Sequence, residues 1–225
     1  MGLKKDKDKE TTMLQTISEE IVNAITHGIG SLLSIVGLVF LIYFSIKKAS
    51  TTHVVSCSLY GGSLVLLYTI STLYHSITHE TAKKVFRRLD HISIYLLIAG
   101  SYIPIALVVL KGAVGWTLFG IECGLCLIGI VFKAVFGPRF GVVSGLFYLL
   151  MGWIAIIAVK PIYTSLPKNA LMWLLLGGAF YTFGIFFFAI DKKFSFFHAI
   201  WHAFVLAGSI CHYIMIFLYI IPFSI

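Results

Sequence analysis

Two histidines near the C-terminus, His198 and His202, have the spacing of a metal site. Residues four positions apart on an α-helix lie one above the other on the same face, so their imidazoles can hold one divalent ion between them. The residues around this pair, from Phe197 to Val205, are almost entirely apolar. Unpaired polar groups in such surroundings carry a desolvation cost that a metal or a hydrogen-bond network would offset. The pair therefore predicts a metal site, and Zn²⁺ is the ion we expect.

The composition indicates that a membrane surrounds these histidines. The chain has 225 residues, of which 59% are hydrophobic and only 12% are charged, and its mean hydropathy is +0.98. These values exclude an ordinary soluble domain. A helix needs about 20 apolar residues to cross a bilayer. Seven apolar runs joined by short links predict an all-α, polytopic membrane protein with a seven-transmembrane helical bundle: 23–44, 54–77, 90–110, 114–136, 141–159, 169–190 and 196–222.

The net charge of +8 indicates orientation in the membrane rather than a nucleic-acid partner. The N-terminus and the links after spans two, four and six lie on one side, and that side holds 12 of the 17 Lys and Arg residues. The positive-inside rule then makes the N-terminus cytoplasmic and leaves the C-terminus outside. We expect residues 1–18 to form a short charged cytoplasmic tail without a cleaved signal peptide, and residues 19–225 to form one membrane domain.

This topology brings three further polar residues to the depth of the histidine pair. His75 lies near the cytoplasmic end of the second span, and Ser71 lies one helical turn before it on the same face. Asp90 opens the predicted third span in the same leaflet. Three imidazoles make a zinc coordination shell with a fourth position free for water or substrate. We therefore expect His75, His198 and His202 to be the metal ligands.

Asp90 has several roles open to it at this stage. Its carboxylate could orient a water molecule or accept its proton, which would imply catalysis, or it could ligate the metal, which would imply a structural site. A carboxylate at the start of a helix also stabilises the helix by capping it. The Ser71 hydroxyl could support a ligand, the water or an oxyanion. We take Asp90 and Ser71 as candidate catalytic residues.

A polar stripe at the start of the first span allows two interpretations. Glu20, Asn23 and His27 recur at helical spacing, so their side chains share one face. They would either support the metal ligands in that leaflet or lie at the membrane interface, where they would cap the helix and meet lipid headgroups. The sequence supports both interpretations of the stripe equally.

The remaining histidines are not expected to join the metal ligands. His53 and His79 fall in predicted links, and His91 points about 100° away from Asp90 around a helix. His212 follows His202 by ten residues, which places it roughly 15 Å deeper along the helix axis. That distance is too great for a shared coordination shell.

Other polar or unusual residues within the spans favour structural roles. Pro104 is expected to kink the third span, because proline removes one backbone hydrogen bond. Glu122 is an intramembrane carboxylate near the outer leaflet, so it is either functional or protonated and hydrogen-bonded. Cys123 and Cys126 form a C-x-x-C pair inside a Gly-rich helix, where packing is favoured over redox or metal chemistry.

Together these motifs resemble the progestin and adipoQ receptor superfamily, and the short chain is similar to its bacterial hemolysin III branch. The resemblance covers the chain after about Ser18. It implies seven helices with a cytoplasmic N-terminus in the bacterial plasma membrane and a zinc ion on His75, His198 and His202. It also implies that Asp90 hydrogen-bonds the zinc-bound water and that Ser71 belongs to the same motif. The motifs that carry it are Ser71-x-x-x-His75, Leu89-Asp90, Gly100-Ser101-Tyr102-x-Pro104, His198-x-x-x-His202, Glu20-x-x-Asn23-x-x-Thr26-His27 and Trp201-His202.

Three classes of function follow. Relatives in the wider group include alkaline ceramidases, so the resemblance implies a zinc-dependent hydrolase that takes a membrane lipid amide or ester from the bilayer. The family name implies a cytolysin or channel, although no continuous polar face runs along several spans. The receptor branch implies a sensor or regulator of the membrane in which zinc is structural. We favour the hydrolase and keep both others as alternatives.

Overall fold

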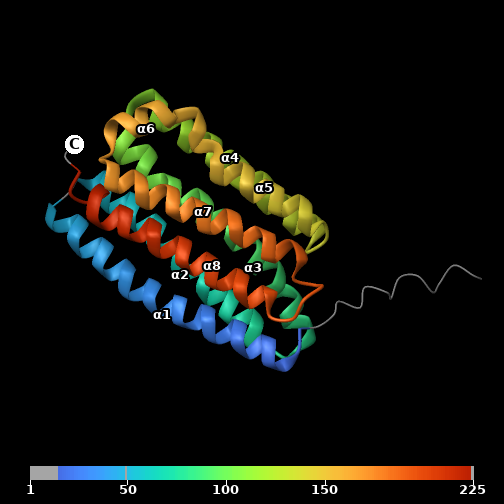
Figure 1. Ribbon diagram of the computed structural model, residues 1–225. Coiled ribbons are helices and arrows are strands. Elements are labelled where there is room, and N and C mark those ends of the chain that lie inside the picture. Colours follow the sequence, from blue (N-terminus) through green and yellow to red (C-terminus); the bar gives the residue numbers. More distant parts are fainter. Residues whose placement is uncertain (1–14, 49, 224–225) are drawn as a thin grey trace, which may run out of the picture.

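The computed structural model describes residues 15–48 and 50–223, and all regular structure in those residues is helical (Figure 1). Long apolar segments form the α-helices, and three short segments with π or 3₁₀ hydrogen bonding extend three of them. The elements are α1 (Ile17–Lys48), α2 (Thr51–Ser76), α3 (Glu80–Pro104), η1 (Ile105–Leu110), α4 (Gly112–Phe136), α5 (Gly141–Trp153), η2 (Ile154–Ala158), α6 (Val159–Ser165), α7 (Lys168–Ile190), α8 (Phe197–Met215) and η3 (Ile216–Ile220).

Seven of the helical segments in the described residues are long and apolar enough to cross a membrane. Three of these spans are composite, since η1 continues α3, η2 and α6 continue α5, and η3 continues α8. The prediction of an all-α chain with seven spans is confirmed. The cytoplasmic position of the N-terminus stays a prediction, and most of the expected tail, residues 1–14, lies outside the described residues.

The helices lie side by side in one elongated bundle (Figure 1). The second helix, α2, packs against both α1 and α3, while α8 packs against α7 and also reaches α1. The first and last helices of the chain are therefore neighbours. Helices α4 and α5 form the edge of the bundle opposite α1 (Figure 1).

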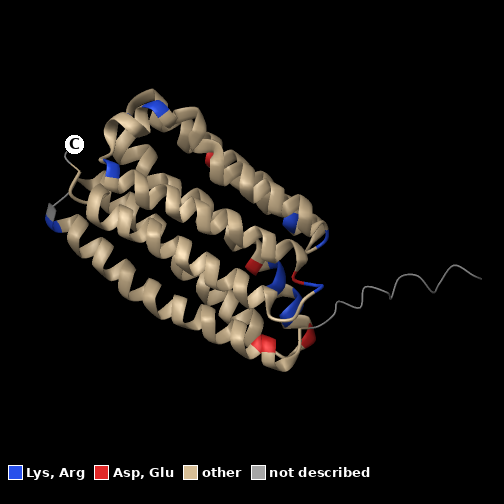
Figure 2. Cartoon of the chain, viewed as in Figure 1, with Lys and Arg blue, Asp and Glu red and all other residues tan. Residues whose placement is uncertain are grey.

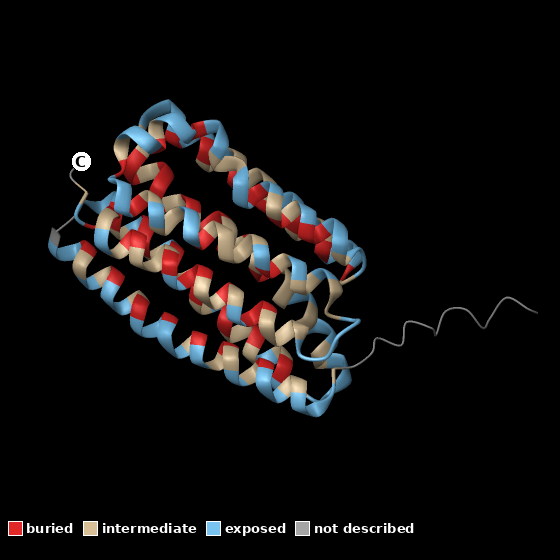
Figure 3. Ribbon diagram, in the orientation of Figure 1, coloured by how far each residue is buried: buried red, intermediate tan, exposed pale blue. Residues whose placement is uncertain are grey.

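Burial follows the expectation for a protein that lipid surrounds. Buried positions face between the helices, and exposed positions form the outer faces (Figure 3). Many of the exposed side chains are large and apolar, such as Leu32, Val39 and Leu175. Charged residues lie mostly at the two ends of the bundle (Figure 2). This distribution leaves apolar surface along the length that the bilayer hydrocarbon would cover.

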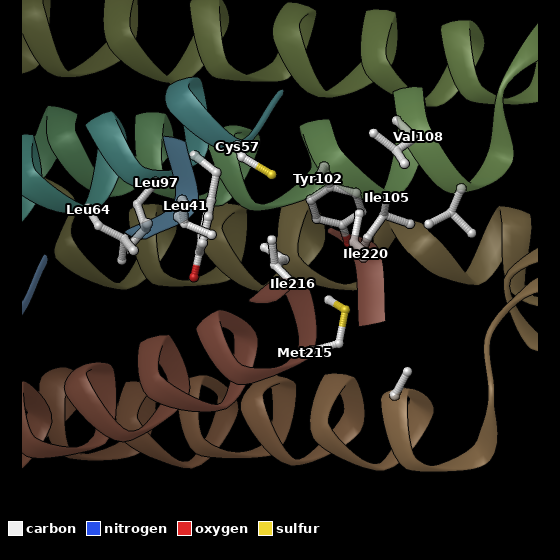
Figure 4. Packing of buried hydrophobic residues seen from close by; sticks show 14 of the residues in the cluster. Leu41, Cys57, Leu64, Leu97, Tyr102, Ile105, Val108, Met215, Ile216 and Ile220 are labelled. Atoms are coloured by element: carbon white, nitrogen blue, oxygen red, sulfur yellow. The ribbon is translucent and has the colours of Figure 1, made fainter. Parts of the chain in front are cut away.

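Aliphatic and aromatic side chains from several helices fill the centre of the bundle (Figure 4). Tyr68 is fully buried, and its hydroxyl donates a hydrogen bond to the Ser209 hydroxyl at 2.7 Å. Its ring also packs against Gly30 so closely that a Cβ atom there would lie 2.6 Å from a ring carbon. Gly30 therefore lets α1 approach α2, as small residues do in membrane bundles.

The third helix differs from the sequence prediction at its start, whereas the span that it begins ends at Leu110 as predicted. It begins at Glu80 rather than Asp90, because the basic run that we interpreted as a link is helical. His79, not Asp90, caps the helix and accepts a hydrogen bond from the backbone of Ala82. The interpretation of Asp90 as a helix cap is wrong. At its other end the hydrogen-bond pattern changes to π-helical directly after Pro104, where proline lacks a donor.

Candidate metal centre

Three histidines meet at one end of the bundle. His75 lies in the last turn of α2, while His198 and His202 lie in the first two turns of α8. Their ligand atoms all lie within 4.8 Å of one another. The ring centroids are 5.3 Å apart for His75 and His198, and 4.6 Å apart for His198 and His202. His75 and His202 are buried, and His198 is half-buried. The predicted convergence of these residues is therefore observed.

Two carboxylates hold the imidazoles on the side away from this meeting point. The Nδ1 atom of His75 lies 2.7 Å from Oε2 of Glu20, and Nδ1 of His198 lies 2.8 Å from Oδ2 of Asp191. The other oxygen of Glu20 forms an ion pair with Lys83 at 2.7 Å. A carboxylate that accepts a hydrogen bond from Nδ1 fixes the tautomer and leaves Nε2 as an unprotonated ligand. This is the arrangement of metal-binding histidines.

The remaining nitrogens fit a bound cation. Nε2 of His75, Nε2 of His198 and Nδ1 of His202 are buried and have no hydrogen-bond partner in the described residues. Buried polar atoms are rarely left unpaired, because each loses its hydrogen bonds to water. Three imidazole nitrogens are a donor set that zinc accepts, with a fourth position left for water or substrate. The histidine cluster could therefore hold a metal ion.

The polar stripe of the first helix belongs to this centre. Glu20 supports His75, as described, and His27 stacks on His202 with ring centroids 3.5 Å apart and planes 12° apart. Asn23 is fully buried, and its Nδ2 atom donates to Gln15 at 2.6 Å. Asn23 and His27 are too deeply buried for an interfacial stripe. Of the two interpretations, support for the metal ligands is the one that the structure favours.

Asp90 and Ser71 lie beside the histidines without belonging to the group of ligand atoms. The Asp90 carboxylate interacts electrostatically with both His75 and His198, and it faces the Ser71 hydroxyl. Ser71 Oγ is buried and has no formed hydrogen bond within the described residues. Among the described residues, the group of side chains close enough to share a metal ion consists of the three histidines and does not include Asp90. Asp90 therefore lies beside the histidine cluster and outside its group of ligand atoms.

Three of the other histidines lie away from the group of ligand atoms. His212 donates a hydrogen bond from Nε2 to the Leu174 carbonyl oxygen at 3.2 Å, deep in the bundle. His79 caps α3. The placement of His53 in a link is wrong, because it lies in the first turn of α2, where its ring bonds Ser50 and the Phe223 carbonyl.

The C-x-x-C pair has no metal or disulfide partner in the described part of the chain. All four cysteines are free. Cys126 packs in a buried apolar cluster with Tyr95, Tyr148 and Met151. The packing interpretation of Cys126 is confirmed.

An apolar cavity of about 80 Å³ begins one helical turn deeper than the centre. Leu67 in its wall lies one turn from Ser71 on α2, and Ile94 lies one turn from Asp90 on α3. On α8 the wall residue Trp201 directly precedes His202. The cavity continues toward the middle of the bundle along Ile98, Tyr102, Tyr148, Tyr181 and Val205.

Asp191 is the functional candidate that the sequence did not reveal. It lies directly after α7, and the turn that follows brings it back to the first turn of α8. The one signal in the sequence was a lone acid next to Lys192 and Lys193, seven residues before His198. The same turn is also bonded to α1, because Oε1 of Glu19 accepts a hydrogen bond from the Phe196 backbone N–H at 2.7 Å.

Comparison with known proteins shows the family of this chain. The Haemolysin-III related family matches residues 15–213. The chain belongs to the haemolysin-III-related family. It is 47% identical to Hemolysin-3 of Bacillus cereus, over 96% of this chain and 98% of that protein. It is 52% identical to the Hemolysin-3 homolog of Bacillus subtilis (strain 168), over 91% of this chain and 95% of that protein.

This haemolysin-III-related chain is also similar, more distantly, to an animal protein. It is 28% identical to the human monocyte to macrophage differentiation factor, over 91% of this chain and 86% of the human protein. The resemblance inferred from the histidine, serine and aspartate motifs is confirmed at the level of the family.

Proposed function

We propose that this haemolysin-III-related protein is a multi-pass membrane hydrolase that uses zinc to cleave an amide or ester bond of a membrane lipid. The observation that carries the proposal is the juxtaposition of the histidine cluster, Asp90 and the apolar cavity. His75, His198 and His202 would hold the zinc. A zinc ion bound there polarises a carbonyl group and lowers the pKa of a water molecule toward neutrality.

Each residue of the chain has a separate task in this proposal. Glu20 and Asp191 hold the Nδ1 protons of two ligands and so keep their Nε2 atoms ready to bind. Asp90 accepts the proton of the attacking water, because it faces the cluster without belonging to it. The Ser71 hydroxyl, which is buried beside the Asp90 carboxylate, would donate to the oxygen on which negative charge develops.

The cavity supports a lipid as the substrate. Its walls are almost wholly apolar, and its beginning lies next to Ser71, Asp90 and His202. An acyl chain in the cavity would place its carbonyl group at the histidines. Binding energy from the remote chain would then position the reacting bond. We propose the inner leaflet of the plasma membrane as the source, following the predicted cytoplasmic N-terminus.

The names of the Bacillus relatives favour membrane lysis as a second candidate function. The relative from Bacillus cereus is named Hemolysin-3, and a hemolysin is a protein that lyses red cells. Fatty acids and lysolipids, the products of the proposed hydrolysis, themselves disrupt membranes. Lysis would then be a consequence of the reaction rather than a separate mechanism.

The test measures zinc stoichiometry and lipid products on the detergent-purified wild type and on Asp90→Ala. Both samples are incubated with a mixed lipid extract, and released products are identified by mass spectrometry. We expect about one zinc per chain in both proteins and release of free fatty acid by the wild type alone. Loss of zinc in Asp90→Ala would make Asp90 a ligand and the metal structural. Unchanged lipids in the wild type would point to a sensor or to direct lysis.

A further inference from the structure

Lys133 is a charged side chain buried at the opposite edge of the bundle from α1, outside the metal centre. It lies in the last turn of α4 and is 0% exposed, and its Nζ atom has no hydrogen-bond partner in the described residues. A lysine near the end of a membrane helix usually extends its side chain to the aqueous interface. This ammonium group points into the protein instead, so it needs an anionic partner.

Two further unpartnered polar groups lie at the same level on α3. A Cβ atom at Gly129 would come 2.5 Å from the Tyr95 ring, so these two positions face each other. Because α3 and α4 are antiparallel, Lys133 one turn after Gly129 faces His91 one turn before Tyr95. The Nδ1 atom of His91 is also buried without a hydrogen-bond partner in the described residues, and the buried hydroxyl of Tyr95 faces those of Ser144 and Tyr148 without a formed hydrogen bond to either. Three potential donors therefore converge from two helices.

The charges around these donors are predominantly positive. Arg87, one turn before His91, interacts electrostatically with both His91 and Lys133, and the candidate metal ligand His198 and Lys192 also interact electrostatically with His91. Arg87 faces Asp90 as well, which is the acid closest to this group on its own helix. No ion pair of the described residues includes Lys133. A group with several anionic oxygens, such as a phosphate, would satisfy these donors.

An apolar groove at the lipid-facing surface begins at Tyr95, one of these three donors. It lies between α4 and α5, has a volume of about 320 Å³, and is lined by Ile128, Phe132, Val143, Phe147 and Leu150. Tyr95 belongs both to the wall of the groove and to the group of unpartnered donors. Ile128 is 60% exposed, so the groove is open on its outer side. Figure 1 shows the two helices along one edge of the bundle, where lipid would reach them.

From this juxtaposition we propose a second ligand site, for an anionic phospholipid. Its phosphate binds Lys133, His91 and Tyr95, and one acyl chain lies in the groove between α4 and α5. The depth of Lys133 in the membrane suits a phospholipid phosphate. Lys133 lies three residues before the end of α4, about 4.5 Å from the level of the headgroups. A free phosphate would satisfy the donors but would leave the groove empty, so the charge and the groove together favour a lipid.

The test measures lipid retention by native mass spectrometry of the full chain purified in detergent. Dioleoyl phosphatidylglycerol is the probe, and dioleoyl phosphatidylcholine, with the same chains and no net charge, is the comparison. We expect the wild type to retain phosphatidylglycerol preferentially and Lys133→Met to weaken this retention at least roughly tenfold, as for loss of a buried charge pair. The matched control Lys84→Met removes an exposed lysine of α3 and should retain the lipid as the wild type does.

Further measurements distinguish lipid binding from binding of other ligands and from effects of the metal centre. Ile128→Trp should obstruct the groove and reduce retention with Lys133 intact, and it carries the test if Lys133→Met does not fold. Retention unchanged in either folded variant would overturn the proposal. Displacement of the lipid by an equal concentration of inorganic phosphate would also overturn it, in favour of a free-phosphate site. Removal of metal with a chelator should leave retention unchanged, so this result does not depend on the proposed hydrolase.

Discussion

Glu20 and His75 are 55 residues apart in the chain, yet a carboxylate oxygen of Glu20 lies 2.7 Å from Nδ1 of His75. The contact joins the first turn of α1 to the last turn of α2. It also involves Lys83 of α3, which pairs with the second carboxylate oxygen. One acidic side chain therefore links three helices and orients a candidate metal ligand.

The first prediction concerns that link. Glu20→Gln removes the charge that stabilises the Nδ1 proton of His75, and it should weaken zinc binding about 10- to 100-fold. Competition against a fluorescent zinc chelator measures the change. Glu80→Gln is the matched control, because Glu80 is an exposed acid at the start of α3. Equal affinities for the wild type and Glu20→Gln would show that this carboxylate does not act on the metal site.

The second prediction concerns the ligands themselves. His198→Ala and His202→Ala should each remove most of the bound zinc, because two remaining imidazoles make an incomplete shell. His212→Ala should retain it, since His212 bonds the Leu174 carbonyl away from the cluster. The measurement is the zinc content per purified chain, determined by elemental mass spectrometry. A similar loss in all three variants would exclude the site as described.

The third prediction concerns the close approach of α1 and α2. Gly30→Ala would place a Cβ atom 2.6 Å from the ring of Tyr68, which itself packs edge-on against His27. We expect a loss of about 1–3 kcal/mol in the free energy of unfolding, the usual cost of overpacking. Gly62→Ala is the control, with no atom within 4 Å of the added carbon. Thermal unfolding in detergent should separate the two variants, and identical curves would contradict the packing.

The fourth prediction concerns the apolar cavity. Ile98→Trp should fill part of its volume and reduce cleavage of lipids with long acyl chains, while zinc content stays near that of the wild type. Short-chain analogues, which need less of the cavity, should be affected less. Leu175→Trp adds the same side chain at a position that is 60% exposed. Long-chain cleavage that survives Ile98→Trp would place the substrate elsewhere.

The sequence predicted the spans well because a bilayer requires about 20 apolar residues in each one. The common depth of His75, His198 and His202 followed from counting crossings, and the structure brings them together. The start of α3 was wrong because the basic residues from Lys83 to Arg88 continue the helix beyond the apolar run. Hydropathy marks where the membrane ends, and it does not mark where a helix ends.

Asp191 was missed for a different physical reason. Its contact with His198 depends on the path of the turn between α7 and α8, and such turns have no periodic pattern in sequence. The buried state of Lys133 was equally hidden, since a lysine near a span end usually reaches water. The roles assigned to Asp90 and Ser71 stay predictions.

The adjacency of α1 and α8 has a consequence for the biosynthesis of the protein. Glu19 and Glu20 are synthesised long before Phe196, His198 and His202, which follow them by about 180 residues. During translation, five spans must insert after α2 before the histidines of α8 can meet His75. A chain that stops before α8 lacks two of the three candidate ligands, so metal bound at the proposed site would report that α8 has been made and has packed against α1 and α2.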